Sequence, residues 1–130
     1  MIVIDASALL ETLLDPSVAA ALHKKLTALG EFLCAPHLID LEITHALRRR
    51  VGLRQLASDR AIEALSDLSA LRIDRYPHLG LLKRVWELRQ NLTAYDAIYV
   101  ALAEELDAPL ITQDLKLASA PGHSAIIELL

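Results

Sequence analysis

The chain has 130 residues, of which 54% are hydrophobic and only 4% are aromatic, and its formal net charge is −4 at pH 7. The hydrophobic content excludes a disordered chain, and no apolar run approaches the roughly 20 residues that span a bilayer. The acidic balance argues against a protein that only coats nucleic acid, since such proteins are normally basic. The length predicts a single domain over residues 1–130 with an aliphatic core.

The single cysteine, Cys34, excludes an internal disulfide framework and a cysteine-based zinc site. It lies in the apolar stretch FLCA, where a small buried hydrophobe is the favoured interpretation and a reactive thiol the alternative. The first residues, MIVIDASALL, carry an acid and no basic residue, unlike a secretory signal. We therefore expect a cytoplasmic protein that does not insert into a membrane.

Short β-branched runs alternate with longer helical runs along the whole chain. In chain order they predict a strand over 1–5, a helix over 16–30, a strand over 32–36, helices over 37–52 and 58–71, a strand over 71–77, a helix over 79–90, a helix capped by Thr93, a strand over 108–114, a short helix to Ala118 and an edge strand over 125–130. This alternation predicts an α/β/α sandwich with a central, mostly parallel sheet of four to five strands. Right-handed crossovers place the strand C-termini along one edge, where ligands bind.

Four carboxylates are expected at that edge. Asp5 ends the first strand, Asp114 follows the fourth, Asp96 lies in the first turn of the helix before the fourth strand, and Glu42 lies about one turn into the 37–52 helix. Asp5 and Asp114 could instead be helix N-caps, Asp96 could belong to a capping box, and Glu42 could be a solvated charge. Caps alone do not explain why four acids gather at the ligand-binding edge.

Carboxylates that lie this close repel and raise one another's pKa. A hard divalent cation relieves the repulsion, and Mg²⁺ or Mn²⁺ prefers oxygen ligands. No paired spacing for zinc occurs among the five histidines, which are His23, His37, His45, His78 and His123. A Mg²⁺ site favours phosphodiester hydrolysis, because the ion acidifies bound water and offsets charge on phosphate oxygens.

The segments IVIDASAL, LEITHALRR, TAYDAIYVALA and PLITQD, in this order, resemble the PIN domain of VapC-type toxins. The resemblance spans the whole chain. It implies a PIN-like sandwich fold and a Mg²⁺- or Mn²⁺-dependent endoribonuclease that is the toxin of a type II toxin–antitoxin system. It also implies an RNA substrate, a homodimer, and a cognate protein antitoxin that inserts a segment into the acidic groove.

Carried over by position, the resemblance implies that Asp5, Glu42, Asp96 and Asp114 hold the metal and carry out catalysis. Helical periodicity alone does not choose between Asp40 and Glu42, and Glu42 is preferred because its surroundings match the family. The resemblance adds Thr112 as a hydroxyl that supports the acids, and Ser7 as a similar group near Asp5.

The sequence departs from the family pattern at two places. His45 stands where members often carry Asn, which puts the contacts near Glu42 in question. Lys116 and Leu117 stand where some members carry a further acid, which leaves open whether one or two metal ions bind.

Four arginines, Arg48, Arg49, Arg50 and Arg54, crowd the end of the 37–52 helix. They are either solvated cations that favour a helix C-terminus or contacts to RNA phosphates. In the second case Arg49 is the best candidate, with Arg48 beside it.

Two other functions compete with the nuclease hypothesis. One is a catalytically silent PIN-like module that uses the same groove only to bind a protein. The other is a receiver-like signalling domain, which would require a lysine after the last strand, where none occurs.

Overall fold

A computed structural model describes all residues 1–130 and has a five-stranded sheet at its centre. The strand order is β3-β2-β1-β4-β5, and every neighbouring pair is parallel. The strands are β1 (Ile2–Ile4), β2 (Leu33–Pro36), β3 (Ile73–Tyr76), β4 (Leu110–Thr112) and β5 (Ile127–Leu129). The predicted α/β/α sandwich is confirmed, and the last strand lies at an edge as expected.

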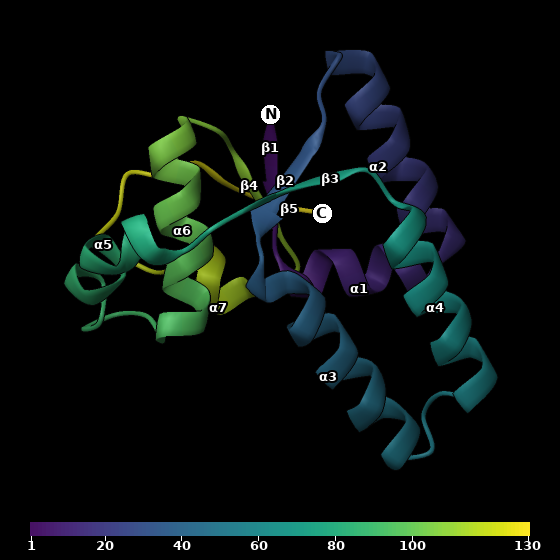
Figure 1. The fold of residues 1–130 in the computed structure, drawn as a ribbon. Helices are drawn as coiled ribbons and strands as arrows, with labels where there is room; N and C mark the ends of the chain where they lie inside the picture. Colours follow the sequence, from purple (N-terminus) through teal and green to yellow (C-terminus); the bar gives the residue numbers. More distant parts are fainter.

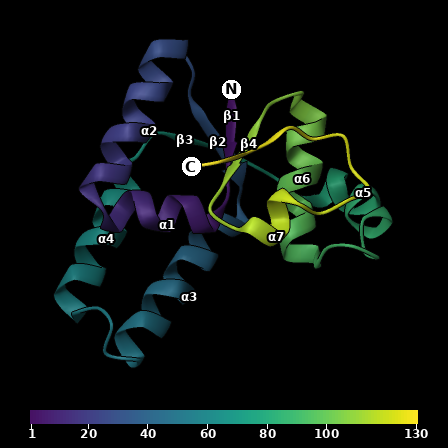
Figure 2. The same cartoon turned by 180° about the vertical axis from the view of Figure 1, so that it is seen from behind.

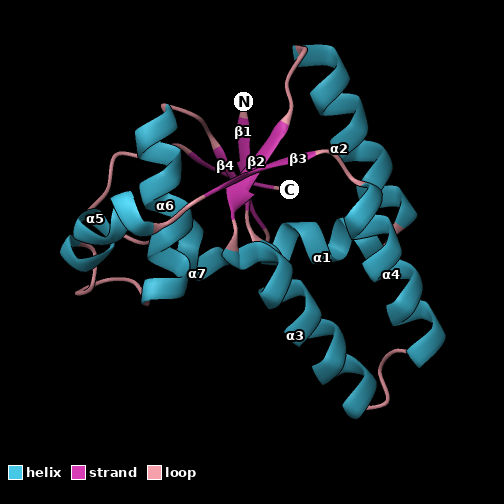
Figure 3. Cartoon of the chain, in the orientation of Figure 1, coloured by secondary structure: helices cyan, strands magenta, loops and turns pink.

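Helices cover both faces of this sheet (Figures 1 and 2). One side carries α1 (Ala6–Leu14), α2 (Pro16–Leu29), α3 (Leu38–Gly52) and α4 (Ser58–Ala70). The other side carries the 3₁₀ helix η1 (Leu79–Leu81), α5 (Leu82–Glu87), α6 (Ala94–Leu106) and α7 (Leu115–Ala118). Helices α3 and α4 contact each other and extend beyond the sheet as a pair (Figure 3). None of the helices has the length and apolar character needed to cross a bilayer.

The structure has one helix that was not expected, and one expected helix is shorter than predicted. Helix α1 begins directly after β1, where sequence reasoning placed only a possible cap at Asp5. The expected 79–90 helix is instead η1 followed by α5, and the backbone from Leu88 to Leu92 forms turns. These turns lead to Thr93, whose extended backbone and Oγ1, which accepts from the Asp96 N–H, begin α6 as predicted.

The core is aliphatic and lies between the sheet and its two helical layers. In α6 every residue from Ala97 to Ala103 is buried, because this helix packs against β1, β2 and β4 on one side and against α5 on another. Cys34 is fully buried on β2, and burial raises the pKa of its thiol to about 11. The cysteine is therefore a core residue and not a reactive thiol.

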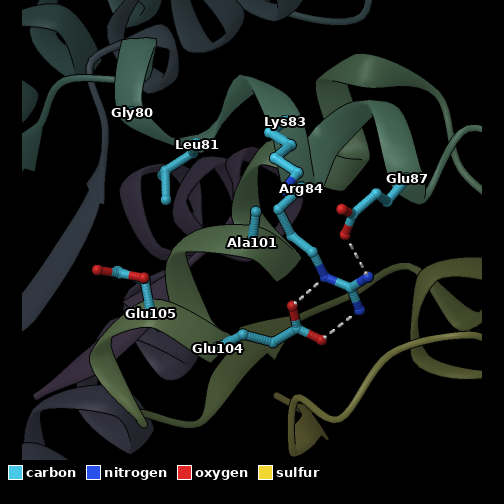
Figure 4. Close-up of a pocket in the computed structure, with 8 residues that line it drawn as sticks. All are labelled: Gly80, Leu81, Lys83, Arg84, Glu87, Ala101, Glu104 and Glu105. Carbon is cyan, nitrogen blue, oxygen red and sulfur yellow. Dashed lines mark hydrogen bonds and ion pairs between the residues drawn. The ribbon is translucent and has the colours of Figure 1, made fainter.

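An ion-pair cluster joins α5, α6 and the segment before β5. The Arg84 guanidinium donates to Glu104 on α6 at 2.7 and 3.0 Å and to Glu87 at 3.2 Å (Figure 4). Glu104 also accepts from the Ser124 backbone N–H at 2.9 Å. These contacts line a hollow of about 320 Å³ that contains none of the four predicted site acids.

Candidate active site

Asp5 stands where β1 ends and α1 begins, and its side chain is only 5% exposed. Its Oδ1 accepts from the Ala8 backbone N–H at 2.9 Å, which makes Asp5 the N-cap of α1, and from the Ser7 hydroxyl at 2.7 Å. The cap interpretation is therefore correct, and it leaves the second carboxylate oxygen, Oδ2, free of backbone contacts.

Two hydroxyl groups connect the end of β1 to the end of β4. Thr112 donates to Oδ2 of Asp5 and accepts from the Asp114 backbone N–H at 2.9 Å. Ser7 donates to the same carboxylate and accepts from the Gln113 N–H at 2.9 Å. Each hydroxyl has one proton, and both protons go to Asp5. This arrangement suits an ionised Asp5, because an ionised carboxylate only accepts hydrogen bonds.

The Asp5 carboxylate has one acceptor position that no hydrogen bond fills. A carboxylate has about four acceptor positions, two on each oxygen. Ser7 and Ala8 fill the two on Oδ1, and Thr112 fills one on Oδ2. One position on Oδ2 remains for a further partner.

Glu42, the fifth residue of α3, faces the buried side of α6. Its Oε2 accepts from the phenol hydroxyl of Tyr99, which is 2% exposed. Asp40, the alternative candidate, instead accepts from Nε and Nη2 of the Arg75 guanidinium at 2.7 and 2.8 Å. The geometry favours Glu42, since Asp40 already has a partner that neutralises its charge.

Asp96 and Asp114 lie at the starts of α6 and α7. Asp114 caps α7, where its Oδ1 accepts from the Lys116 N–H at 2.8 Å and the Leu117 N–H at 3.4 Å. Asp96 sits in the first turn of α6, where carboxylates interact favourably with the positive end of the helix. The predicted cap at Asp114 is confirmed, and capping uses one of its two oxygens.

The charges of these acids raise one another's pKa values. Burial raises the pKa of Asp5, and the charge of Asp114 adds to this rise against the hydrogen bonds that Asp5 accepts. Burial also raises the pKa of Glu42, with further increases from Asp96 and Asp5. The pKa of Asp96 is raised by burial and by Asp114. The four predicted acids therefore share one electrostatic environment, although they come from four separate parts of the chain.

The four carboxylates have the chemistry that a hard cation prefers, but their side chains are not positioned to bind one ion together. All four groups are carboxylates that destabilise one another's charge, and a divalent cation would relieve that cost. As the side chains stand, however, no three His, Cys, Asp or Glu residues are arranged so that they could hold one metal ion. Shared coordination therefore requires side-chain rotation, for example by Asp96 and Asp114, which are only half-buried.

A groove leads away from the acids between α1, α3 and α6. It has a volume of about 600 Å³ and is lined by Ala6, Ser7, Leu10, Leu38, Leu41, Glu42, His45, Ala46 and Tyr95. A second hollow of about 380 Å³ shares Leu10, His45 and Ala46 with it and continues to Arg49 and Arg50.

The predicted arginines differ in their surroundings. Arg50 is paired with Glu11 at 2.7 Å, whereas Arg49 is exposed and lines the second hollow. Arg48 is exposed and lies outside both hollows. Of the two predicted RNA contacts, only Arg49 lines a hollow next to the groove that contains Glu42.

The sequence analysis did not include Tyr99 among the candidate site residues. The residue is buried, but its hydroxyl reaches Glu42. Burial also keeps the pKa of this phenol well above its usual value, so that the hydroxyl remains a donor. A signal was available, because Tyr99 follows Asp96 by three residues and so lies on the same side of α6.

Comparisons with known proteins agree with this architecture. The model of the PIN domain family matches residues 2–122. Ribonuclease VapC9 of Mycobacterium tuberculosis is 47% identical over 118 residues, covering 91% of this chain and 89% of the relative. Ribonuclease VapC1 of the same species is 44% identical over 129 residues, covering 98% and 96%.

A solved structure shares the fold. It is VapBC2 from Rickettsia felis, bound to a DNA fragment from the promoter of its genes, and it superposes with a TM-score of 0.71 over 99% of this chain and 98% of the other. The sequence identity is 15%, so that this likeness concerns the fold.

Proposed function

This chain belongs to the PIN-domain family, and on that premise we propose that it is an endoribonuclease and the toxin of a type II toxin–antitoxin system. The main support is the gathering of Asp5, Glu42, Asp96 and Asp114 where the parallel strands end. Relatives that are 44–47% identical over most of the chain are named ribonucleases, which supports the same activity.

We propose that the four acids hold Mg²⁺ or Mn²⁺. When bound, such an ion would acidify a water molecule and offset charge on the attacked phosphate. Asp5 would offer the remaining position on Oδ2. The hydroxyl of Thr112 on Oδ2 and that of Ser7 on Oδ1 would fix the orientation of the carboxylate. Tyr99 would hold one oxygen of Glu42 and leave the other facing the site.

We propose three partners for this protein, which are RNA, a protein antitoxin and a second copy of the chain. Arg49 would contact a backbone phosphate of RNA from the hollow next to the acids. A protein antitoxin would cover the four acids when the toxin is silent. A homodimer is supported by the apolar side chains that η1 and α5 expose, Leu79, Leu82 and Trp86.

The test is RNA cleavage by wild-type protein and by Asp5→Asn, each with and without Mg²⁺ or Mn²⁺. We expect cleavage only by wild type and only with the ion, while Asp5→Asn keeps a native circular dichroism spectrum. Asn preserves the shape of the side chain and can still accept from the Ala8 N–H, so that the α1 cap persists. Undiminished cleavage by a folded Asp5→Asn would remove Asp5 from the mechanism.

The same assay separates the nuclease from a silent binding module. A silent module would bind Mn²⁺ through its intact acids without cleaving RNA. Wild-type protein that binds Mn²⁺, yet leaves total cellular RNA intact after removal of any bound antitoxin, would favour the silent module.

A further inference from the structure

The two tyrosines at the start of α6 have opposite surroundings. Tyr99 is 2% exposed and donates to Glu42, whereas Tyr95 is 63% exposed although it directly precedes Asp96. A single exposed aromatic side chain is ordinary on a protein surface. Tyr95 differs from an ordinary exposed aromatic residue because it lies next to one of the candidate site acids, Asp96.

Tyr95 forms part of the wall of the 600 Å³ groove that also contains Ser7 and Glu42. Tyr95 also lines a smaller, apolar hollow of about 190 Å³, together with Leu38 and Ile98. Because Tyr95 borders both spaces, its side chain stands between them. The larger groove lies within the range of about 300–1,000 Å³ that is typical of small-ligand sites.

We infer that Tyr95 stacks on an unpaired base of the RNA substrate, next to the phosphate that lies at the acids. This inference rests on the proposed ribonuclease function. The uncharged face of a base suits a groove with mostly apolar lining, whereas the phosphates on either side suit the metal-binding acids and Arg49. Aromatic side chains bind single-stranded RNA in this way, since every base offers a flat face.

The lining of the groove favours a base over a peptide as its occupant. An extended peptide carries a backbone N–H and C=O at every residue, and each needs a partner when buried. In this groove the polar side-chain groups belong to Ser7, Glu42, His45 and Tyr95, and the other lining side chains are apolar. A stacked base needs no hydrogen bond through its face and can direct its polar edge toward solvent.

The experiment measures RNA affinity without cleavage. Tyr95→Ala and Tyr95→Phe are made in the Asp5→Asn protein, and binding of a short, unstructured, fluorescently labelled RNA is followed by anisotropy. Phe32→Ala is the matched control, because Phe32 is a partly exposed aromatic residue outside the groove. We expect Tyr95→Ala to weaken binding by about 5- to 150-fold, the range measured for loss of one stacked base. Tyr95→Phe keeps the ring and should bind like the parent, as should Phe32→Ala.

An abasic scan identifies the contact itself. Removing the base at one position of the RNA should weaken binding to the parent by the same factor, and Tyr95→Ala should then cost nothing more. Equal affinity of Tyr95→Ala and parent for the intact RNA would overturn the inference, as would an RNA that does not bind at all. Weakened binding of the antitoxin with unchanged RNA binding would overturn it in favour of a peptide.

The two experiments distinguish failure of the base contact from failure of the proposed activity. If wild-type protein cleaves RNA while Tyr95→Ala binds it normally, the base contact fails and the ribonuclease stands. If binding depends on Tyr95 while wild type cleaves no RNA, the ribonuclease fails and the base contact stands.

Discussion

The hydroxyl of Tyr99 donates to Glu42 from within α6, and its removal gives a sharp test at the scale of one residue. Tyr99→Phe keeps the ring and leaves Glu42 without that donor. We expect the Mn²⁺ concentration for half-maximal cleavage to rise by about 10- to 100-fold, as is usual when a group that orients a metal ligand is lost. Stability should fall by only about 1–3 kcal/mol. An unchanged Mn²⁺ requirement would show that Tyr99 serves packing alone.

Single residues also show the limit of sequence reasoning. The capping signals at Asp5, Asp114 and Thr93 were readable, because each side chain bonds to a backbone N–H two or three residues later. The bond from Tyr99 to Glu42 spans 57 positions, and the pairing of Arg75 with Asp40 spans 35. Such contacts depend on how α3 meets α6 and β3, which local patterns do not specify.

At the scale of elements, the pair Arg84–Glu104 holds α5 against α6 (Figure 4). The hydrogen bonds from Arg84 lower the pKa of Glu104 to about 2. The pair therefore contributes stability above the ordinary glutamate pKa of about 4.3, and that contribution is lost as pH falls toward the lower value. Because Arg84 remains partly exposed, we expect about 1 kcal/mol.

The corresponding test compares melting temperatures of wild type and Glu104→Gln across acidic pH. The variant should melt about 4 °C lower at neutral pH, and the difference should shrink as pH falls from about 4.3 to about 2. Glu105→Gln is the control, because Glu105 is exposed and points away from Arg84 (Figure 4). A difference that stays constant with pH would show that Glu104 does not owe its role to its charge.

Element order was predictable and element boundaries were less so. The helix expected over 16–30 matches α2 to within one residue, because Asp15 caps its start, Pro16 is its first residue and Gly30 ends it. Helix α1 escaped notice because it begins without a break after β1, and its apolar residues continue those of the strand. The residues after Glu87 have helical composition, yet the chain turns there so that Leu88 enters the core.

At the scale of the whole molecule, the parallel sheet is what brings the candidate site together. All five strands point the same way, so that the loops after β1 and β4 meet at one edge and α3 and α6 complete the surroundings. The alternation of strands and helices made this convergence predictable. The orientation of the four carboxylates was not predictable, because it depends on side-chain packing between distant parts of the chain.

The most direct test is anomalous diffraction from a crystal of the wild-type protein soaked in Mn²⁺. The account predicts an anomalous peak among Asp5, Glu42, Asp96 and Asp114, with Oδ2 of Asp5 turned to the ion. The peak should vanish from crystals of Asp114→Asn grown and soaked in the same way. A fully soaked wild-type crystal without a peak at these acids, or with Mn²⁺ bound only elsewhere, would contradict it.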